Sequence, residues 1–285
     1  LMLLVPATAL ADETNVTDTT TAESFVCYGD DLNSEQFEKV MNLLGADLSK
    51  DQLIKVTIDD EKALLGSIIS ADKIGSRSLS SARVTLTGEG TGISVTTQNI
   101  NWVTSSMYSS ALATAGVDNA RIVVAAPVEV SGTAALAGIL KAYESAASTQ
   151  LSDEAKAVAG SEMVLTGDLA DMIGSDDAVE LLAMVKNAIA EYHLDDYDSL
   201  RPYVEQGAKQ LGVQLTEDQI DQITKLGVQI AKLDLDPEKL AGQLNGLVDN
   251  IQKIQKVQQS ADSIFTNIKT AVQGFFNWIG SWFKR

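Results

Sequence analysis

The spacing of apolar residues changes once along this chain, and this change most constrains the fold. From Leu53 to Tyr143 the apolar spacing alternates between two residues, as in strands, and three to four, as in helices. After Ser152 only the helical spacing remains. The sequence therefore predicts an α+β domain over residues 28–150, followed by an all-helical region over residues 151–285.

The first part predicts a specific order of elements. We expect strands at Leu53–Ile58, Leu79–Thr87, Ile93–Gln98 and Ala120–Ala126, and helices at Asp60–Ala71, at Thr104–Gly116 and from Thr133. This is the order of the ferredoxin-like split β-α-β-β-α-β unit, although other α+β folds also have it. The glycine-rich joint 88–92 predicts a hairpin between the second and third strands.

The second part predicts a series of amphipathic helices. Ser175–Tyr192 and Thr216–Leu233 each place their apolar residues on one face, and Asp236 with Pro237 begins a further helix. A short pattern, Gly-x-x-Leu-cap-x-x-Gln, occurs three times, with Asn33, Ser49 and Thr216 at the cap position. Such a polar residue accepts from the amide three residues on, while the Gln returns the bond. The pattern therefore predicts three helix starts.

The first eleven residues are typical of the end of a secretory signal peptide. An apolar stretch is followed by small residues at Ala9 and Ala11, which the peptidase requires before its cleavage site. The alternative is a short core strand or the start of a buried helix. We expect residues 1–11 to be a signal-peptide remnant, with the mature protein beginning at Asp12. Residues 12–27 are expected to be a flexible spacer, because they begin with a long polar run.

Charge and cysteine content exclude several classes of protein. The formal net charge of −18 disfavours nucleic-acid partners and simple electrostatic attachment to anionic lipid. Cys27 is the sole cysteine, so no disulfide can form within the chain. The bulky Phe25 and Val26 before it do not suit a lipidation site. We expect a large-cored exported protein with a buried or idle thiol.

Several short motifs occur between residues 44 and 136: Leu-Gly-Ala-Asp-Leu-Ser at 44–49, Ile-Gly-Ser-Arg-Ser-Leu-Ser-Ser at 74–81, Met-Tyr at 107–108, Thr-Ala-Gly at 114–116 and Ala-Pro-Val-Glu-Val-Ser-Gly-Thr-Ala-Ala-Leu at 126–136. These motifs resemble the YpuA-like family, secreted proteins of unknown function found chiefly in Gram-positive bacteria. The resemblance is close over residues 28–143 and looser beyond them. It implies a cell-envelope address and carries no activity with it.

Catalytic and metal motifs find little support in the sequence. His193 is the only histidine, and a zinc site of ordinary composition cannot be built from it and one distant cysteine. Neither a calcium-loop spacing nor a Gly-x-Ser-x-Gly elbow occurs. We therefore expect no cofactor and a non-catalytic binding or structural role in the cell envelope. The alternative is a hydrolase or transferase that acts on envelope polymers.

The turn Ser131, Gly132 and Thr133 is the best candidate for a ligand site, because it leaves a strand and opens a helix. Unpaired amides at such a helix start can bind a carboxylate or phosphate. The alternative is a well-capped turn in which Ser131 or Thr133 satisfies those amides.

The C-terminus combines aromatic and basic residues, as helices that lie in a lipid interface do. The candidate contact residues for a membrane surface or an envelope component are Phe275, Phe276, Trp278, Ile279, Trp282, Phe283, Lys284 and Arg285. The stretch is too short and interrupted to span a bilayer. The alternative is that these aromatic side chains complete the core of the helical region.

Overall fold

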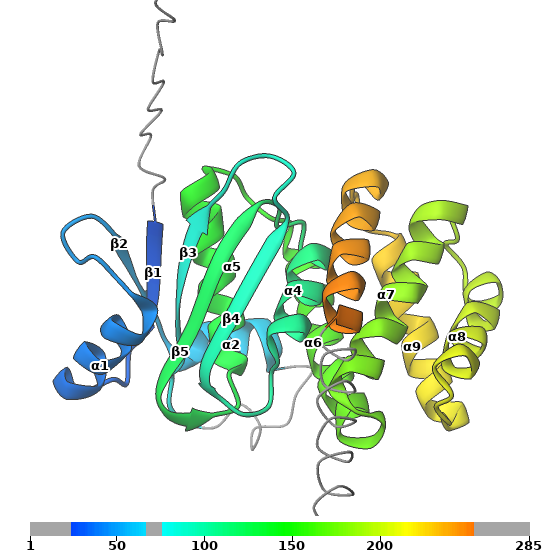
Figure 1. Cartoon of the computed structure of the whole chain (residues 1–285), viewed down its shortest axis with the longest axis horizontal. Helices are drawn as coiled ribbons and strands as arrows, with labels where there is room; N and C mark the ends of the chain where they lie inside the picture. The colour runs from blue at the N-terminus through cyan, green and yellow to red at the C-terminus, as the bar shows by residue number, and fades with distance from the viewer. Residues whose placement is uncertain (1–23, 67–75, 254–285) are drawn as a thin grey trace, which may run out of the picture.

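The computed structural model describes residues 24–66 and 76–253 as a five-stranded sheet followed by a row of helices (Figure 1). The strands are β1 (Ser24–Gly29), β2 (Gln52–Val56), β3 (Ser81–Leu86), β4 (Ile93–Ile100) and β5 (Ala120–Val130). The helices are α1 (Ser34–Leu44), α2 (Ile58–Leu65), α4 (Ser105–Thr114), α5 (Thr133–Ala147), α6 (Asp153–Ile173), α7 (Ser175–Tyr192), α8 (Tyr197–Leu211) and α9 (Glu217–Ala231). A further helix covers 237–253. The α+β class and the helical C-terminal part are thereby confirmed.

The sheet order is β2-β1-β3-β5-β4, which differs from the ferredoxin-like arrangement. The outer pairs β1–β2 and β4–β5 are parallel, and β3 runs antiparallel to β1 and to β5. The expected hairpin is wrong, because β5 lies between β3 and β4. Residues 24–27, which the sequence analysis assigned to the spacer, form most of the buried strand β1.

Side-chain chemistry explains the positions of β4 and β5. Strand β5 is apolar toward both faces, and Ile122 and Val123 pack into clusters on opposite sides of the sheet. Such a strand gains most from an interior position. Strand β4 exposes Ser94, Thr96 and Gln98. The polar strand therefore lies at the edge.

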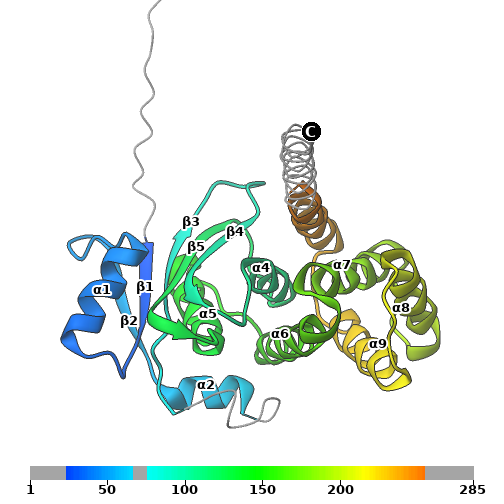
Figure 2. The same cartoon turned by 60° about the horizontal axis from the view of Figure 1, so that its bottom comes forward.

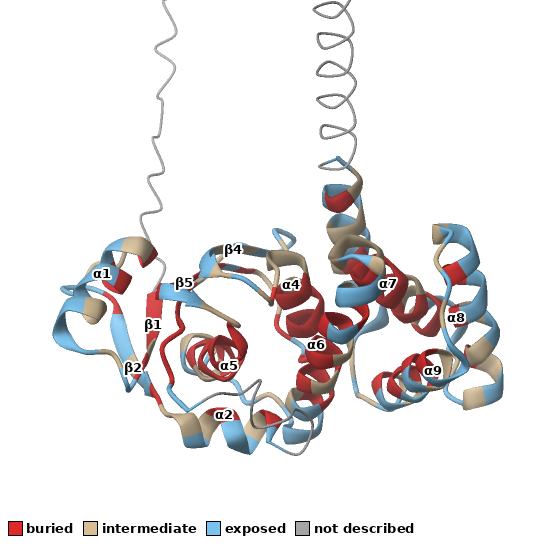
Figure 3. Ribbon diagram, turned by 90° about the horizontal axis from the view of Figure 1, so that it is seen from below, coloured by how far each residue is buried: buried red, intermediate tan, exposed pale blue. Residues whose placement is uncertain are grey.

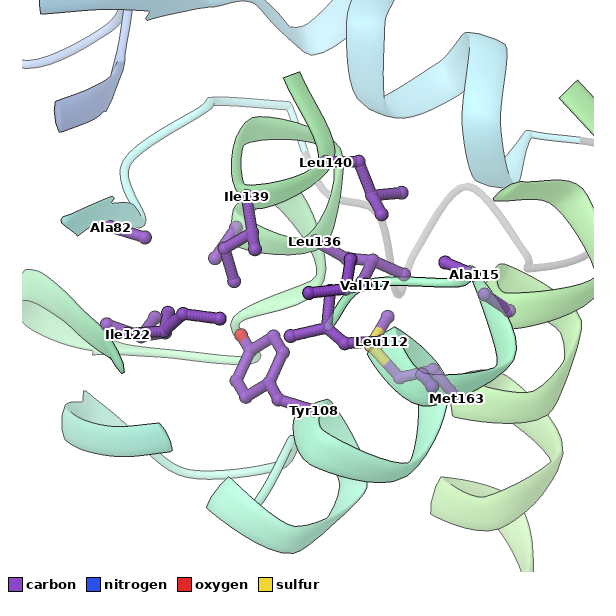
Figure 4. Packing of buried hydrophobic residues seen from close by; sticks show 14 of the residues in the cluster. Ala82, Tyr108, Leu112, Ala115, Val117, Ile122, Leu136, Ile139, Leu140 and Met163 are labelled. Atoms are coloured by element: carbon purple, nitrogen blue, oxygen red, sulfur yellow. The ribbon is translucent and has the colours of Figure 1, made fainter. Parts of the chain in front are cut away.

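Helices cover both faces of the sheet. Helix α1 packs on one face through Val40, Met41 and Leu44. On the other face α4 and α5 form the main core with the strands, and Figure 4 shows Tyr108 and Leu112 of α4 beside Ile122 of β5 and Leu136 of α5. This core fixes where α4 lies beside β4.

The helices after residue 152 extend this core sideways. Helix α6 packs on α4, α7 packs on α6, and α8 and α9 close the row (Figure 2). Met163 of α6 and Val179 of α7 belong to the same buried cluster as the sheet residues. The buried faces of α4, α6 and α7 meet in Figure 3. One continuous core thus crosses the loop at 148–152, where we expected a domain boundary.

Two of the three expected helix starts are confirmed. Asn33 and Thr216 both form complete capping boxes, with Gln36 and Gln219 respectively. The third is wrong, because Gln52 begins β2 instead of a helix. There Asp47 accepts hydrogen bonds from the backbone and hydroxyl of Ser49, and this local turn replaces a helical cap.

Candidate functional site

A groove of about 900 Å³ lies between β4, the N-terminal half of α4 and the helix at 237–253. The elements that form it are far apart in sequence but adjacent in space (Figure 2). Its lining mixes apolar side chains such as Val95 and Leu247 with hydroxyls such as Ser105 and Ser109. A concave surface with scattered polar groups is what small ligands and peptide segments occupy.

Trp102 enters the lining from the loop between β4 and α4. A Cβ atom on Gly167 of α6 would lie 2.3 Å from Cζ2 of this indole. Only glycine therefore allows α6 to approach so closely. The close packing of α6 fixes the ring beside the groove.

The helix at 237–253 contributes two glycines, Gly242 and Gly246, to the groove lining. A Cβ atom added at either position would meet no atom of residues 24–66 and 76–253 within 4 Å. No packing contact with these residues therefore requires glycine there, although each glycine weakens a helix by about 1 kcal/mol relative to alanine. Because neither glycine has a side chain, this helix leaves more space in the groove.

A polar contact attaches this helix to the sheet part. Nζ of Lys239 lies 3.1 Å from Oδ2 of Asp118, and Nε2 of Gln243 donates to Oδ1 of Asp118 and to the carbonyl of Val117. The bond to Asp118 raises the pKa of Lys239. Glu89 and Asp176 also line the groove and form no ion pair in the described part of the chain. The groove therefore has an acidic border.

None of Ser131, Gly132 and Thr133 lines this groove, although the amide of Val103, a lining residue, donates to the carbonyl of Ser131. Helix α5 begins at Thr133, with Gly132 at a φ of 94° as its cap residue and no capping side chain. The hydroxyl of Tyr108 donates to the carbonyl of Gly132, and that of Thr133 donates to Oε1 of Glu61. The protein's own carboxyl group therefore lies at this helix start, and binding of an external anion there stays a prediction.

Glu61 is fully buried, and its Oε2 has no hydrogen-bond partner in the described part of the chain. Burial raises the pKa of Glu61 to about 7, and the bond from Thr133 offsets part of that rise. Beside it, burial also raises the pKa of Tyr108, and the charge of Glu61 adds to this rise. Glu61, Thr133 and Tyr108 are buried and none of them lines the groove, so this acid does not face a ligand bound there.

A second enclosed cluster joins α4, α6 and α7. Nζ of Lys186 lies 2.7 Å from Oε1 of Glu162 and donates to Oγ of Ser110 at 2.8 Å. Thr114 donates to the other oxygen of Glu162. Burial lowers the pKa of Lys186, and the charge of Glu162 counteracts this. A serine beside a lysine can form a nucleophile pair. Here, however, neither Ser110 nor Lys186 lines the groove, and both residues form hydrogen bonds within the buried cluster.

Of the remaining residues considered in the sequence, His193 and Cys27 are described by the structure, and the two chain ends are not. His193 is exposed at the C-terminal cap of α7, and Cys27 is buried in β1, where burial raises its pKa to about 12. In residues 24–66 and 76–253, no three His, Cys, Asp or Glu side chains converge as metal ligands would. Residues 1–11, Asp12 and the C-terminal aromatic residues lie outside the described residues. None of the described helices combines the length and apolar composition needed to cross a bilayer.

Neither the groove nor the Lys186 cluster is among the sites predicted from the sequence. Lys186 follows Leu182 by four residues, which places it within the apolar face of α7 and could have identified it as buried. The glycines at 242 and 246 have the same spacing and could have indicated a flattened helix face. Nothing in the sequence alone places that face opposite β4.

Comparisons with known proteins identify a family without an assigned activity. The model of the family described as "Protein of unknown function (DUF1002)" matches residues 28–247. The uncharacterized protein YpuA of Bacillus subtilis (strain 168) is 34% identical over 283 residues, which cover 97% of this chain and 95% of that protein. No solved structure matches. The expected resemblance to YpuA-like proteins is confirmed.

Proposed function

We propose that this chain, which belongs to the DUF1002 family, is an exported cell-envelope protein that binds its partner non-catalytically in the groove between β4, α4 and the helix at 237–253. The function of the family is unknown. The proposal therefore rests on the geometry of this chain and on its first residues.

The observation that carries the proposal is the glycine pair in the groove wall. Gly242 and Gly246 weaken their helix without relieving any contact with the residues that the structure describes. Their effect is to leave space beside β4. Since the two glycines lower the stability of the helix, we expect the space that they leave to accommodate a ligand.

The chemistry of the lining favours binding over catalysis. Hydroxyl and amide groups with a few apolar side chains, such as Ser105, Asn101 and Val95, can orient a neutral or cationic ligand. Glu61, whose pKa burial raises to about 7, is enclosed elsewhere. A hydrolase or transferase acting on envelope polymers would instead need such an acid inside the groove.

Export is supported by the first eleven residues, which end in the small-residue pattern of Ala9 and Ala11. The C-terminal aromatic residues, from Phe275 to Phe283, support an additional contact with a membrane surface through apolar burial. Expression in Bacillus subtilis with the native N-terminal sequence tests the address. We expect the protein in the wall or medium fraction, with an intact mass that begins at Asp12. A cytoplasmic protein retaining residues 1–11 would refute export.

The groove is tested by filling it. Gly246→Phe adds a ring where no atom of the described chain lies within 4 Å of a Cβ, so the variant should fold while its groove is obstructed. Gly246→Ala is the matched control. Wild-type protein and Gly246→Ala should sediment with isolated Bacillus subtilis envelopes, and Gly246→Phe should do so at least tenfold less.

Two results would contradict the groove as the binding site. One is equal sedimentation of Gly246→Phe and Gly246→Ala. The other is that all three proteins remain in the supernatant. Urea unfolding of each variant verifies that lost binding does not reflect lost folding.

A further inference from the structure

We infer that the outer edge of β4 binds an extended, positively charged peptide, which adds to the sheet as a sixth strand within the groove. This inference rests on the proposed function, because it names the ligand of the same groove. The evidence is the backbone of β4, the shape of the groove and the charge around it.

The backbone of β4 has one unpaired side. The amide of Ala120 donates to the carbonyl of Gly92, so Gly92 points toward β5. In a parallel ladder alternate residues direct both backbone groups to the same side. Ser94 and Thr96 therefore also point toward β5, and Ile93, Val95 and Thr97 point outward. In the described part of the chain, no hydrogen bond reaches the outward groups of these three residues.

This edge lacks the usual protection against pairing with another chain. Exposed edges are ordinarily blunted by charged side chains, proline or a bulge. Residues 93–97 read Ile-Ser-Val-Thr-Thr, without charge or proline. A register shift comes only at Gln98 and Ile100, where Asn99 has a φ of 58°. About five residues, a length of roughly 16 Å, remain available for strand addition.

The groove provides space along this edge. Ile93, Val95 and Thr97 all line it, and the helix at 237–253 forms the opposite wall. That wall carries Gly242 and Gly246. An added strand would therefore lie beside β4 with its side chains toward hydroxyl groups of α4 on one face and solvent on the other.

The charge determines what kind of peptide fits. Lys239 is the basic side chain of the lining and is already paired with Asp118, whereas Glu89 and Asp176 have no ion-pair partner in the described residues. The whole chain carries a formal charge of −18. A cationic peptide is therefore attracted, and a second copy of this chain is repelled.

The probe is the capped peptide Lys-Val-Thr-Val-Thr-Val-Lys, compared with Glu-Val-Thr-Val-Thr-Val-Glu. Amide hydrogen exchange is followed by NMR on the full chain. At saturating basic peptide, exchange at Ile93, Val95 and Thr97 should slow at least tenfold. Exchange at Ser94 and Thr96, which already bond to β5, should change much less. The acidic peptide, or a basic peptide N-methylated at alternate residues, should have no effect.

Variants separate backbone pairing from charge. Val95→Pro removes one outward amide at an edge position where proline is tolerated, and it should abolish peptide binding, while Val95→Thr should retain it. Glu89→Gln with Asp176→Asn leaves the backbone intact and should weaken binding of the basic peptide by about threefold per charge.

The outcomes distinguish this inference from the proposed function. If Gly246→Phe abolishes envelope binding but the basic peptide protects none of the three outward amides, the groove binds another chemistry and the inference fails. Protection of these amides in a peptide-free dimer would also overturn it, because a second copy would then occupy the edge. If the peptide protects the amides while Gly246→Phe binds envelopes normally, the inference stands and the proposed envelope function fails.

Discussion

Glu61 and Glu162 are both completely enclosed, yet their surroundings differ in kind. Glu162, at the junction of α4, α6 and α7, faces Lys186 and accepts from Ser110 and Thr114. Glu61 of α2 lies beside the start of α5. In the described residues it accepts a hydrogen bond from Thr133 alone, and its second oxygen has no partner. One carboxylate is balanced by an opposite charge, and the other by a single hydroxyl.

Because of this difference, the two regions should respond differently to the loss of a partner and to a change in pH. A buried ion pair with all its hydrogen bonds made is costly to break, because either ion left alone keeps its full desolvation penalty. The Lys186 cluster therefore holds the helical row in one position against the sheet part. At Glu61 the carboxyl group can escape that penalty by taking up a proton, so we expect the stability of its region to depend on pH.

The largest effect is expected from Lys186→Met. The variant leaves the carboxylate of Glu162 buried without its counter-ion, which should lower the free energy of unfolding by about 3–5 kcal/mol. Urea unfolding monitored by circular dichroism measures this loss.

The double variant Lys186→Met with Glu162→Gln is the control, because it removes both charges. It should recover at least half of the lost stability. If the single and double variants were equally destabilised, loss of packing instead of an unpaired charge would explain the effect.

The second effect concerns the pH dependence that Glu61 contributes. Because burial raises the pKa of folded Glu61 from 4.5 to about 7, the folded state binds more protons than the unfolded state between these values. Stability from this group is therefore greatest below pH 4.5 and falls as the pH rises to about 7, by about 3 kcal/mol in total. Glu61→Gln should remove this slope and be more stable than wild type at pH 8.

Unfolding in urea at intervals between pH 4.5 and 8 measures the slope. Glu35→Gln, on the exposed surface of α1, is the matched control and should retain the wild-type pH dependence. Parallel curves for wild type and Glu61→Gln would show that the carboxyl group of Glu61 has an ordinary pKa in the folded protein.

Local signals in the sequence were sufficient to predict the positions of most helices and strands. Thr104 and Thr216 begin helices where expected, because a capping side chain acts within three residues. The run Ala120–Ala126 lies within β5, whose apolar residues suit an interior strand. Strand order was not predictable in the same way, since β1 directly follows the polar run and most of it was assigned with that run to the spacer. Without β1, the remaining strands resembled a ferredoxin-like unit.

The sites depended on contacts between distant segments. Glu61 and Thr133 are 72 residues apart, and Glu162 and Lys186 lie on different helices. Each of these residues looks ordinary in its local sequence. Ser131, Gly132 and Thr133 were correctly identified as the approach to a helix, but the carboxyl group beside them comes from α2. Periodicity indicates which face of an element is buried, and it does not indicate what that face meets.

The smallest effect tests whether one hydroxyl holds the charge of Glu61. Thr133→Val keeps the shape of the side chain and removes the donor to Oε1. Because that bond lowers the pKa of Glu61, its loss should raise the pKa further above 7. The cost in stability should be about 1 kcal/mol at pH 5, where the carboxyl group is protonated, and about 2 kcal/mol at pH 8, where a charged acceptor loses its donor.

Thr133→Ser is the matched control, because it retains the hydroxyl. Its cost in stability should be about 1 kcal/mol at both pH values. Urea unfolding of the two variants at pH 5 and pH 8 gives the four differences needed. An equal cost for Thr133→Val at both pH values would mean that the hydroxyl of Thr133 does not stabilise the charged form of Glu61, and the contrast between Glu61 and Glu162 would then rest on Lys186 and not on the number of donors.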